Sequence, residues 1–191
     1  MTSWSERQLG ECAQFQEGYV NPSQKVGRYF DGPVKWLRAV DLNDSFVSST
    51  SRTLSEEGFK SAGKSAKLFA PGTLAISKSG TIGRLGILKD YMCGNRAVIN
   101  IIPDPSICHP LFIFFVLRHQ RPKIETLADG SVQKNLYVPL LAKFRFKLPP
   151  LDVQCVIAEV LGSLDDKIEL NRRMNETLEA MAQAIFRDWF V

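Results

Sequence analysis

One stretch of the sequence has the letters of a phosphate-binding loop. Residues Gly58-Phe-Lys-Ser-Ala-Gly63-Lys64-Ser65 match the pattern G-x-x-x-x-G-K-[ST], in which backbone amides and a lysine hold nucleotide phosphates. That chemistry needs a buried strand before the loop and a helix after it. The run before Gly58 is too polar for such a strand, and Pro71-Gly72 follows too soon for a crossover helix. We therefore predict no nucleotide site here, and interpret Lys60, Lys64 and Lys67 as a solvated basic surface that could lie along a nucleic-acid backbone.

Other catalytic and metal-binding patterns are not predicted either. The two histidines, His109 and His119, cannot form a His-rich metal site, and the sequence has no Gly-x-Ser-x-Gly nucleophile motif. The four cysteines lie far apart with no Cys-x-x-Cys pair, which disfavours a zinc ribbon and a disulfide framework. We expect no catalytic residue, no metal and no cofactor, and we expect free, mostly buried thiols at Cys12, Cys93, Cys108 and Cys155.

Charge divides the chain into two parts. The formal net charge of +4 is the balance of +8 over residues 1–149 and −4 over residues 150–191. This asymmetry favours a body that faces a polyanion and a tail that faces protein or solvent, although many enzymes carry a similar charge. The longest apolar run, Leu111 to Leu117, is far shorter than the roughly 20 residues that span a bilayer. We expect a soluble, cytoplasmic protein without membrane contact.

The first part of the chain predicts a β-rich body. Its apolar pieces are strand-length, rich in β-branched or aromatic residues, and separated by Gly, Pro, Asn and Asp turn signals. The run Pro110–Arg118 has no alternation, so it predicts either a buried helix or a buried strand, with a slight preference for helix. The fold class we expect is α+β. The predicted strands are Val34–Val40, Thr73–Ser77, Leu85–Leu88, Ala97–Ile102 and Lys143–Leu148.

The last part predicts one long helix. After Pro149-Pro150 there is no proline and one glycine, and helix-favouring residues are abundant. Apolar and asparagine residues recur at alternating steps of 4 and 3 for more than four heptads, which is the pattern of a coiled-coil seam. A helix of this extent would be roughly 60 Å long and needs a partner helix. The seam residues are Ile157, Leu161, Leu164, Ile168, Asn171, Asn175, Leu178, Ala182, Ile185 and Trp189.

Two features of this seam bear on how many helices pack against it. Asn171 and Asn175 are successive seam positions, and their amides must pair with each other, which costs stability but fixes register and partner number. Met174, Met181 and Phe186 lie beside the seam and widen it, so a helical bundle is also acceptable. The alternative is a surface helix that folds back on its own body.

Five motifs, in this order, resemble one known family. They are Trp4-Ser-Glu-Arg-Gln-Leu-Gly-Glu11, Leu68-Phe-Ala-Pro-Gly-Thr-Leu-Ala-Ile-Ser-Lys-Ser-Gly-Thr-Ile-Gly83, Gly130-Ser-Val-Gln-Lys-Asn135, Leu148-Pro-Pro-Leu-Asp-Val-Gln154 and Ala182-Gln-Ala-Ile-Phe-Arg-Asp-Trp-Phe190. Together they resemble the specificity subunit of type I restriction-modification systems. The resemblance covers nearly the whole chain and implies a target recognition domain over 1–148 and a conserved spacer helix over 149–191.

The resemblance also implies a function and partners. Family members do not methylate or cut DNA themselves; they bring the modification (methyltransferase) and restriction subunits to a sequence in double-stranded DNA. A full subunit has two recognition domains and two antiparallel spacer helices, whereas this chain has one of each, and Val153 stands where the family usually has Glu. A half-length subunit could restore the arrangement as a homodimer through the helix, which predicts an interrupted palindrome as the target.

The candidate DNA contacts lie in three polar or basic groups. Gln and Asn can read adenine and Arg can read guanine, whereas Lys and Ser more often hold phosphates. For Gln133 and Asn135 the simpler reading is a turn-stabilising role, as it is for Gly80, Gly83 and Gly130. The candidates are Lys78, Ser79, Thr81 and Arg84; Ser131, Gln133, Lys134 and Asn135; and Lys35, Arg38, Lys60, Lys64 and Lys67.

Two further hypotheses stay open at this point. The first is a coiled-coil adaptor that binds protein and has no DNA specificity. The second is a nucleotide-dependent enzyme that uses Gly58 to Ser65, which would require magnesium-dependent binding that Lys64→Ala abolishes.

Overall fold

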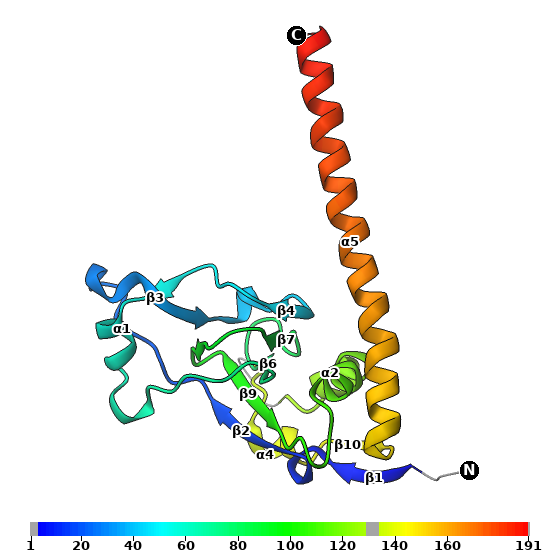
Figure 1. Ribbon diagram of the computed structural model, residues 1–191. Helices are drawn as coiled ribbons and strands as arrows, with labels where there is room; N and C mark the ends of the chain where they lie inside the picture. Colours follow the sequence, from blue (N-terminus) through cyan, green and yellow to red (C-terminus); the bar gives the residue numbers. More distant parts are fainter. Residues whose placement is uncertain (1–3, 129–133, 191) are drawn as a thin grey trace.

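The computed structural model describes residues 4–128 and 134–190, and it consists of a β-rich body from which one long helix projects (Figure 1). The helix, α5, runs from Leu151 to Phe190 and carries the C-terminal end of the chain away from the sheets. The expected α+β fold, with a β-rich body followed by a long C-terminal helix, is confirmed.

A five-stranded mixed sheet forms the centre of the body. Its strands follow the order β2 (Ala13–Glu17), β9 (Val98–Pro103), β6 (Leu74–Ser77), β7 (Leu85–Leu88) and β4 (Ser45–Val47). All neighbours are antiparallel except β4 and β7. β6 and β7 are buried along their whole length, because continuous apolar runs suit strands that are covered on both faces.

Two smaller sheets complete the body. β5 (Thr53–Leu54), β3 (Phe30–Leu37) and β8 (Cys93–Gly94) form one, in which β3 is antiparallel to β5 and parallel to β8. The other pairs β1 (Ser5–Gln8) with β10 (Arg145–Leu148), so the N-terminal strand lies beside the strand that leads into α5.

Helix α2 (Pro110–His119) covers one face of the central sheet. Proline at its first turn costs no hydrogen bond, and five of its ten residues are buried. Successive residues of a strand point to opposite faces, so Leu74 and Ile76 pack into the cluster under α2 while Ala75 packs into a second cluster on the other face. The short helices are α1 (Glu56–Lys60), α3 (Arg121–Glu125), α4 (Val138–Ala142), and the 3-10 turns η1 (Leu9–Glu11), η2 (Gly27–Tyr29), η3 (Ala39–Asp41) and η4 (Gly63–Ser65).

Only the first part of α5 contacts the body. Gln154 and Ala158 are buried, and Ile157 and Leu161 pack against the core beneath α2. Every side chain over residues 171–190 is exposed. The distal half of α5 therefore does not fold back along the body, which was the alternative to a partner helix, whereas its first part does pack on the body.

Most of the strands and helices predicted from the sequence can be matched with observed elements. Each predicted strand overlaps an observed one, although Val34–Val40 ends as a strand at Leu37 and continues into η3. Pro110–Arg118 is a helix. The phosphate-loop letters lie across α1 and η4 rather than between a strand and a long helix, which is the unsuitable context that the sequence predicted. Strands β1 and β2 were missed because their sequences are polar on the exposed side.

Candidate nucleic-acid interface

The turn between β6 and β7, residues 78–84, has a conformation that is fixed by hydrogen bonds from one buried side chain. Buried Ser77 holds it closed: its hydroxyl donates to the carbonyl oxygen of Thr81 at 2.5 Å and accepts from the amide of Arg84 at 2.9 Å. Gly80 and Gly83 have φ values of +74° and +84°, which side chains rarely adopt, so both are turn residues as expected. Thr81 and Arg84 are exposed, which suits contacts to a ligand.

A second candidate segment lies beside this turn. The amide of Leu136 donates to the carbonyl oxygen of Lys78 at 2.8 Å, so the chain directly after Lys134 and Asn135 runs along the start of the turn. Lys78 itself forms an ion pair with Glu17 at 2.6 Å and its side chain is only 16% exposed. Ser131 and Gln133 lie outside the described residues.

Lys35 in β3 and Arg38 directly after it both contact other side chains. Lys35 donates to Asp90 at 2.6 Å, and this hydrogen bond lowers the pKa of the Asp90 carboxyl. Arg38 stacks over the Trp36 ring at 5.5 Å and donates to the Ser51 hydroxyl at 2.6 Å. Lys35 and Arg38 are thus held in place, and the charge of Lys35 is largely neutralised.

The remaining basic candidates lie on and after α1. Lys60 pairs with Glu56 at 3.0 Å, whereas Lys67 donates to the neutral amide of Gln16 at 2.8 Å and keeps its net charge. Lys64 is exposed on η4. Because α1 packs on β3 and Gln16 belongs to β2, the candidates divide into a β3 group and a β2 group that includes Lys67 and Lys78.

The seam of α5 is divided between the body and open solvent. Ile157 and Leu161 pack partly on the core, so they are less available to a partner helix than expected. From Leu164 onwards the large seam side chains are more than half exposed, with Ile168 at 65% and Trp189 at 74%. Other exposed apolar side chains of α5 lie outside the predicted seam: Val156, Val160, Leu170, Met174, Met181, Phe186 and Phe190.

Gln154 fastens the base of α5 to the body. Its buried side-chain amide donates to the carbonyl oxygens of Ile107 at 3.1 Å and Pro149 at 2.9 Å, and its carbonyl oxygen accepts from the amide of His109 at 2.9 Å. The side chain thereby satisfies three backbone groups at the start of α2 and α5. Gln154 was noted only as part of a motif; its spacing gave no sign of this role.

A second attachment lies further along α5. Arg118, at the end of α2, donates to both carboxylate oxygens of Asp165 at 2.6 and 3.0 Å and stacks over Phe114 and Phe115. Between the two attachments, a Cβ on Gly162 would lie 3.0 Å from the Cδ2 atom of Leu111, so α5 packs closely against α2 at this glycine. Sequence reasoning missed Arg118 and Asp165, because a charge at the end of an apolar run does not reveal its partner.

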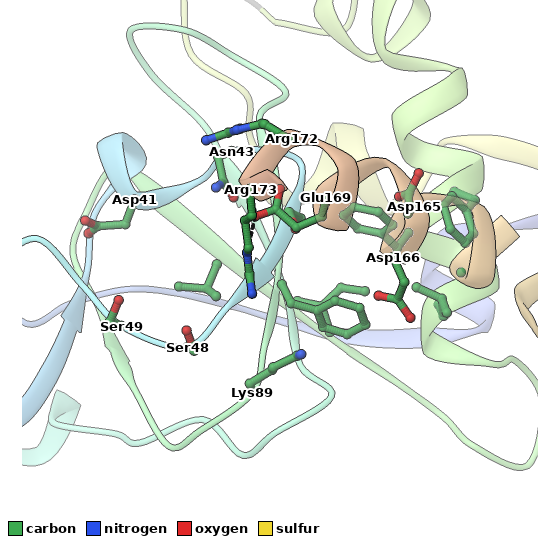
Figure 2. Close-up of a pocket in the computed structure, with 18 residues that line it drawn as sticks. Asp41, Asn43, Ser48, Ser49, Lys89, Asp165, Asp166, Glu169, Arg172 and Arg173 are labelled. Carbon is green, nitrogen blue, oxygen red and sulfur yellow. Dashed lines mark hydrogen bonds and ion pairs between the residues drawn. The ribbon is translucent and has the colours of Figure 1, made fainter. Parts of the chain in front are cut away.

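A cleft of about 340 Å³ opens above this attachment, between the β4 side of the body and α5 (Figure 2). Its lining includes apolar side chains such as Phe46 and Phe114 and charges of both signs: Lys89 comes from the body, whereas Asp166, Glu169 and Arg173 come from α5. Arg173 is already paired with Glu169 at 3.0 Å. A mixed lining of this kind does not select one charged ligand.

The described residues contain no group of three or more His, Cys, Asp or Glu side chains that could hold a metal ion. Cys12, Cys93 and Cys108 are buried free thiols, and Cys155 is exposed on α5. Burial raises the pKa of Cys93 and Cys108 to about 12, which keeps both thiols protonated. Within the parts of the chain that the structure describes, no helix is long and apolar enough to cross a membrane.

Solved structures share this architecture. A chain from a structure of the assembly and conformational transition of the type I R-M system aligns with a TM-score of 0.71 and 17% identity over 97% of this chain and 44% of that one. The HsdS subunit from Thermoanaerobacter tengcongensis aligns with a TM-score of 0.66 and 18% identity over 98% of this chain and 44% of that one. At this level of identity the likeness concerns the fold.

Sequence relatives extend the likeness. The MjaIX specificity subunit of Methanocaldococcus jannaschii is 29% identical over 189 residues, which are 97% of this chain and 42% of that subunit. The HindI specificity subunit of Haemophilus influenzae is 30% identical over 108 residues, 54% of this chain and 23% of that subunit. The chain thus spans less than half the length of these relatives. The family described as the type I restriction modification DNA specificity domain matches residues 1–180, and this chain belongs to that family.

Proposed function

We propose that this chain is the sequence-recognising subunit of a type I restriction-modification complex. In this proposal it binds double-stranded DNA, positions the modification and restriction subunits there, and catalyses no step itself. The observation that carries the proposal is the 78–84 turn: two exposed side chains on a rigid turn, Thr81 and Arg84, lie on a body that is attached at two points to a projecting helix. We also propose that the recognition domain ends at residue 148 and the spacer helix begins at 149.

The contacts of the basic residues refine the candidate DNA contacts. A cation that is already paired gains less from a phosphate than a free one, because one ion pair must be exchanged for another. Lys35, Lys60 and Lys78 have carboxylate partners within 3.0 Å. We therefore expect the exposed Arg84 to read a base, and Lys64 and Lys67 to hold phosphates.

We further propose that α5 pairs with the same helix of a second copy. Nine apolar side chains at the seam and at the heptad positions that flank it, from Val160 to Trp189, are more than half exposed, and together they offer on the order of 1,000 Å² per chain, above the roughly 800 Å² that a standard interface buries on each partner. An apolar stripe of that size needs a cover.

The asparagines fix one register for this pair. In an antiparallel pair, Asn171 faces Asn175 of the partner subunit only if Leu164 faces Ala182 of the partner subunit and Ile168 faces Leu178 of the partner subunit. This register sets the small Ala182 against Leu164 of the partner subunit, whereas a parallel pair would stack Ala182 on its copy and Trp189 on its copy. The antiparallel pair therefore gives more even packing density, and it places one body at each end.

Selection from a random DNA pool tests the DNA-binding proposal. The chain is incubated with the modification subunit and a randomised duplex pool, and bound duplexes are sequenced. We expect enrichment of one bipartite, palindromic sequence with a fixed gap. Dimerisation without any DNA affinity at low salt would instead favour the coiled-coil adaptor, and no enrichment over competitor would refute sequence recognition.

Disulfide cross-linking tests the helix pairing. Leu164→Cys and Ala182→Cys chains, both with Cys155→Ser, should cross-link when mixed and not when separate, since like positions would lie about 27 Å apart. Leu164→Cys mixed with Trp189→Cys, one heptad out of register, is the matched control. Cross-linking of Leu164→Cys to its own copy would show a parallel pair, and a monomeric mass for the unmodified chain would refute dimerisation.

A further inference from the structure

A chain of polar contacts runs from the projecting helix to the 78–84 turn. It begins at Asp165 on α5, which Arg118 of α2 holds through both carboxylate oxygens. Arg118 also donates to the backbone oxygen of Asp44, just before β4, at 3.4 Å. The side chain of Asp44 accepts from Arg121 of α3. These contacts join residues that are widely separated in sequence.

The same chain of contacts ends on the turn itself. Arg121 donates through Nε to the carbonyl oxygen of Gly83 at 2.9 Å. Gly83 has φ +84°, and a Cβ there would lie 3.1 Å from the Arg121 side chain, so the arginine is packed directly against the turn. Its guanidinium thus bridges the turn and Asp44, the kind of geometry that a planar fork of donors suits and a lysine does not.

Asp44 is the junction of these contacts. Its backbone amide donates to the Leu85 carbonyl oxygen at 2.9 Å, and its carboxylate accepts from the Leu85 amide at 3.0 Å as well as from Arg121. It adopts φ +64°, a conformation that Asp and Asn tolerate better than most residues. The Asp44 and Arg121 side chains are 31% and 26% exposed, so the pair is partly shielded from water.

We propose that Asp44, Arg118 and Arg121 are positioning residues for DNA recognition. They fix the orientation of the 78–84 turn relative to α5, so that Thr81 and Arg84 meet DNA at a set distance from the helix. This inference rests on the proposed function. None of the three residues needs to touch DNA: each acts through the backbone of the turn or through the helix.

The two ends of the network have separable effects. Loss of the Arg121 guanidinium frees the turn while α5 stays attached through Arg118 and Gln154. Loss of the contact between Arg118 and Asp165 leaves the turn intact but frees the helix from its second attachment. The first change should reduce base selectivity within a half-site, and the second should widen the range of gaps between half-sites.

Pool selection on the full chain, together with the modification subunit, measures both effects. Arg121→Met should lower the enrichment of the preferred half-site at least tenfold. Arg118→Asp and Asp165→Arg should each spread the selected gap over several lengths, and the double variant, which restores the pair with reversed charges, should regain one length. Arg145→Ala is the matched control, because Arg145 is paired with Glu6 on the exposed β1–β10 edge.

A measurement without DNA separates this inference from the proposed function. Spin labels at Thr81→Cys and Ala180→Cys, with Cys155→Ser, report the distance between turn and helix within one chain when the labelled chain is mixed with an excess of unlabelled Cys155→Ser chain. The distribution should be narrow in the parent and broad with Arg121→Met or Asp165→Arg; Asp44→Asn, which keeps the backbone conformation, serves if a variant loses its helical circular dichroism. Unchanged distributions and unchanged selection would overturn the positioning role. If the parent enriches no sequence, the proposed function fails, whatever the labels report.

Discussion

The body and the projecting helix use the same apolar residue types in opposite ways. In the body, Ile76 and Phe114 are at most 2% exposed, whereas Ile168 and Trp189 on α5 are 65% and 74% exposed. A strand or short helix satisfies its apolar face within the chain, because another element lies against it. The distal half of α5 extends beyond every other element (Figure 1). The body thus covers most of its large apolar side chains, whereas the distal half of α5 leaves its own exposed, and the proposed pairing with a second helix would cover them.

We expect the largest effect from charged substitutions at exposed apolar positions of α5. Leu164→Glu with Leu178→Glu places four charges in the proposed interface of a dimer, where their desolvation is unfavourable. We expect light scattering to report the monomer mass at concentrations where the parent is a dimer. The control is Ala180→Glu with Gln183→Glu, which adds the same charge outside the seam. An unchanged mass in the first variant would mean that the helix does not pair through this face.

We expect the next largest effect from a substitution that removes the contacts between Gln154 and the body. Gln154→Ala leaves the amide of His109 and two carbonyl oxygens without their side-chain partner. We expect a loss of about 2–3 kcal/mol in the free energy of unfolding, since unsatisfied buried groups cost about 1–3 kcal/mol. Urea denaturation measures it. Gln183→Ala, on the exposed half of the same helix, should change the free energy of unfolding very little. Equal losses of stability in the two variants would contradict the role of Gln154 in attaching α5 to the body.

On the body, substitutions of Arg84 and Lys64 should change different properties of DNA binding: selectivity for Arg84 and overall affinity for Lys64. Arg84→Ala should cost about 1–3 kcal/mol for the preferred DNA and relax selectivity at one base pair. Lys64→Ala should weaken all sequences alike and lower the salt dependence of binding. Binding titrations on matched and mismatched duplexes at two salt concentrations distinguish the two. Equal losses on every duplex for Arg84→Ala would assign it to the phosphate backbone.

The smallest effect concerns the cysteine thiols, three of which are buried in the body and one of which is exposed on α5. Because burial raises the pKa of Cys93 and Cys108 to about 12, both stay neutral at pH 8, and the thiolate is the reactive form. Burial likewise raises the pKa of Cys12. A thiol reagent should therefore label the folded protein rapidly at Cys155 alone, and all four cysteines after unfolding. Mass spectrometry counts the labels, and rapid labelling at Cys108 would contradict its burial.

Local patterns in the sequence were sufficient to predict five strands, β3, β6, β7, β9 and β10, and the two longest helices, α2 and α5. The 3.5-residue period, the entry after Pro149-Pro150 and the lack of later proline predict a helix over 149–191, close to the observed Leu151–Phe190 of α5. Apolar runs such as Leu85–Leu88 predict buried strands. These predictions hold because a helix or strand depends mainly on its own residues and their spacing. Polar edge strands such as β1 gave too weak a pattern to be found.

The state of the candidate contacts depended on tertiary structure. Lys35 meets Asp90 across 55 residues of sequence and Lys78 meets Glu17 across 61, so composition alone could not tell paired cations from free ones. The path from Asp165 through Arg118, Asp44 and Arg121 to Gly83 is likewise assembled from distant segments. The sequence by itself determined a β-rich body, a basic charge and a helix with an apolar stripe, because these follow from local periodicity and counting. Only the fold decided which charges stay free and how the helix is held, because those are contacts between residues far apart in the chain.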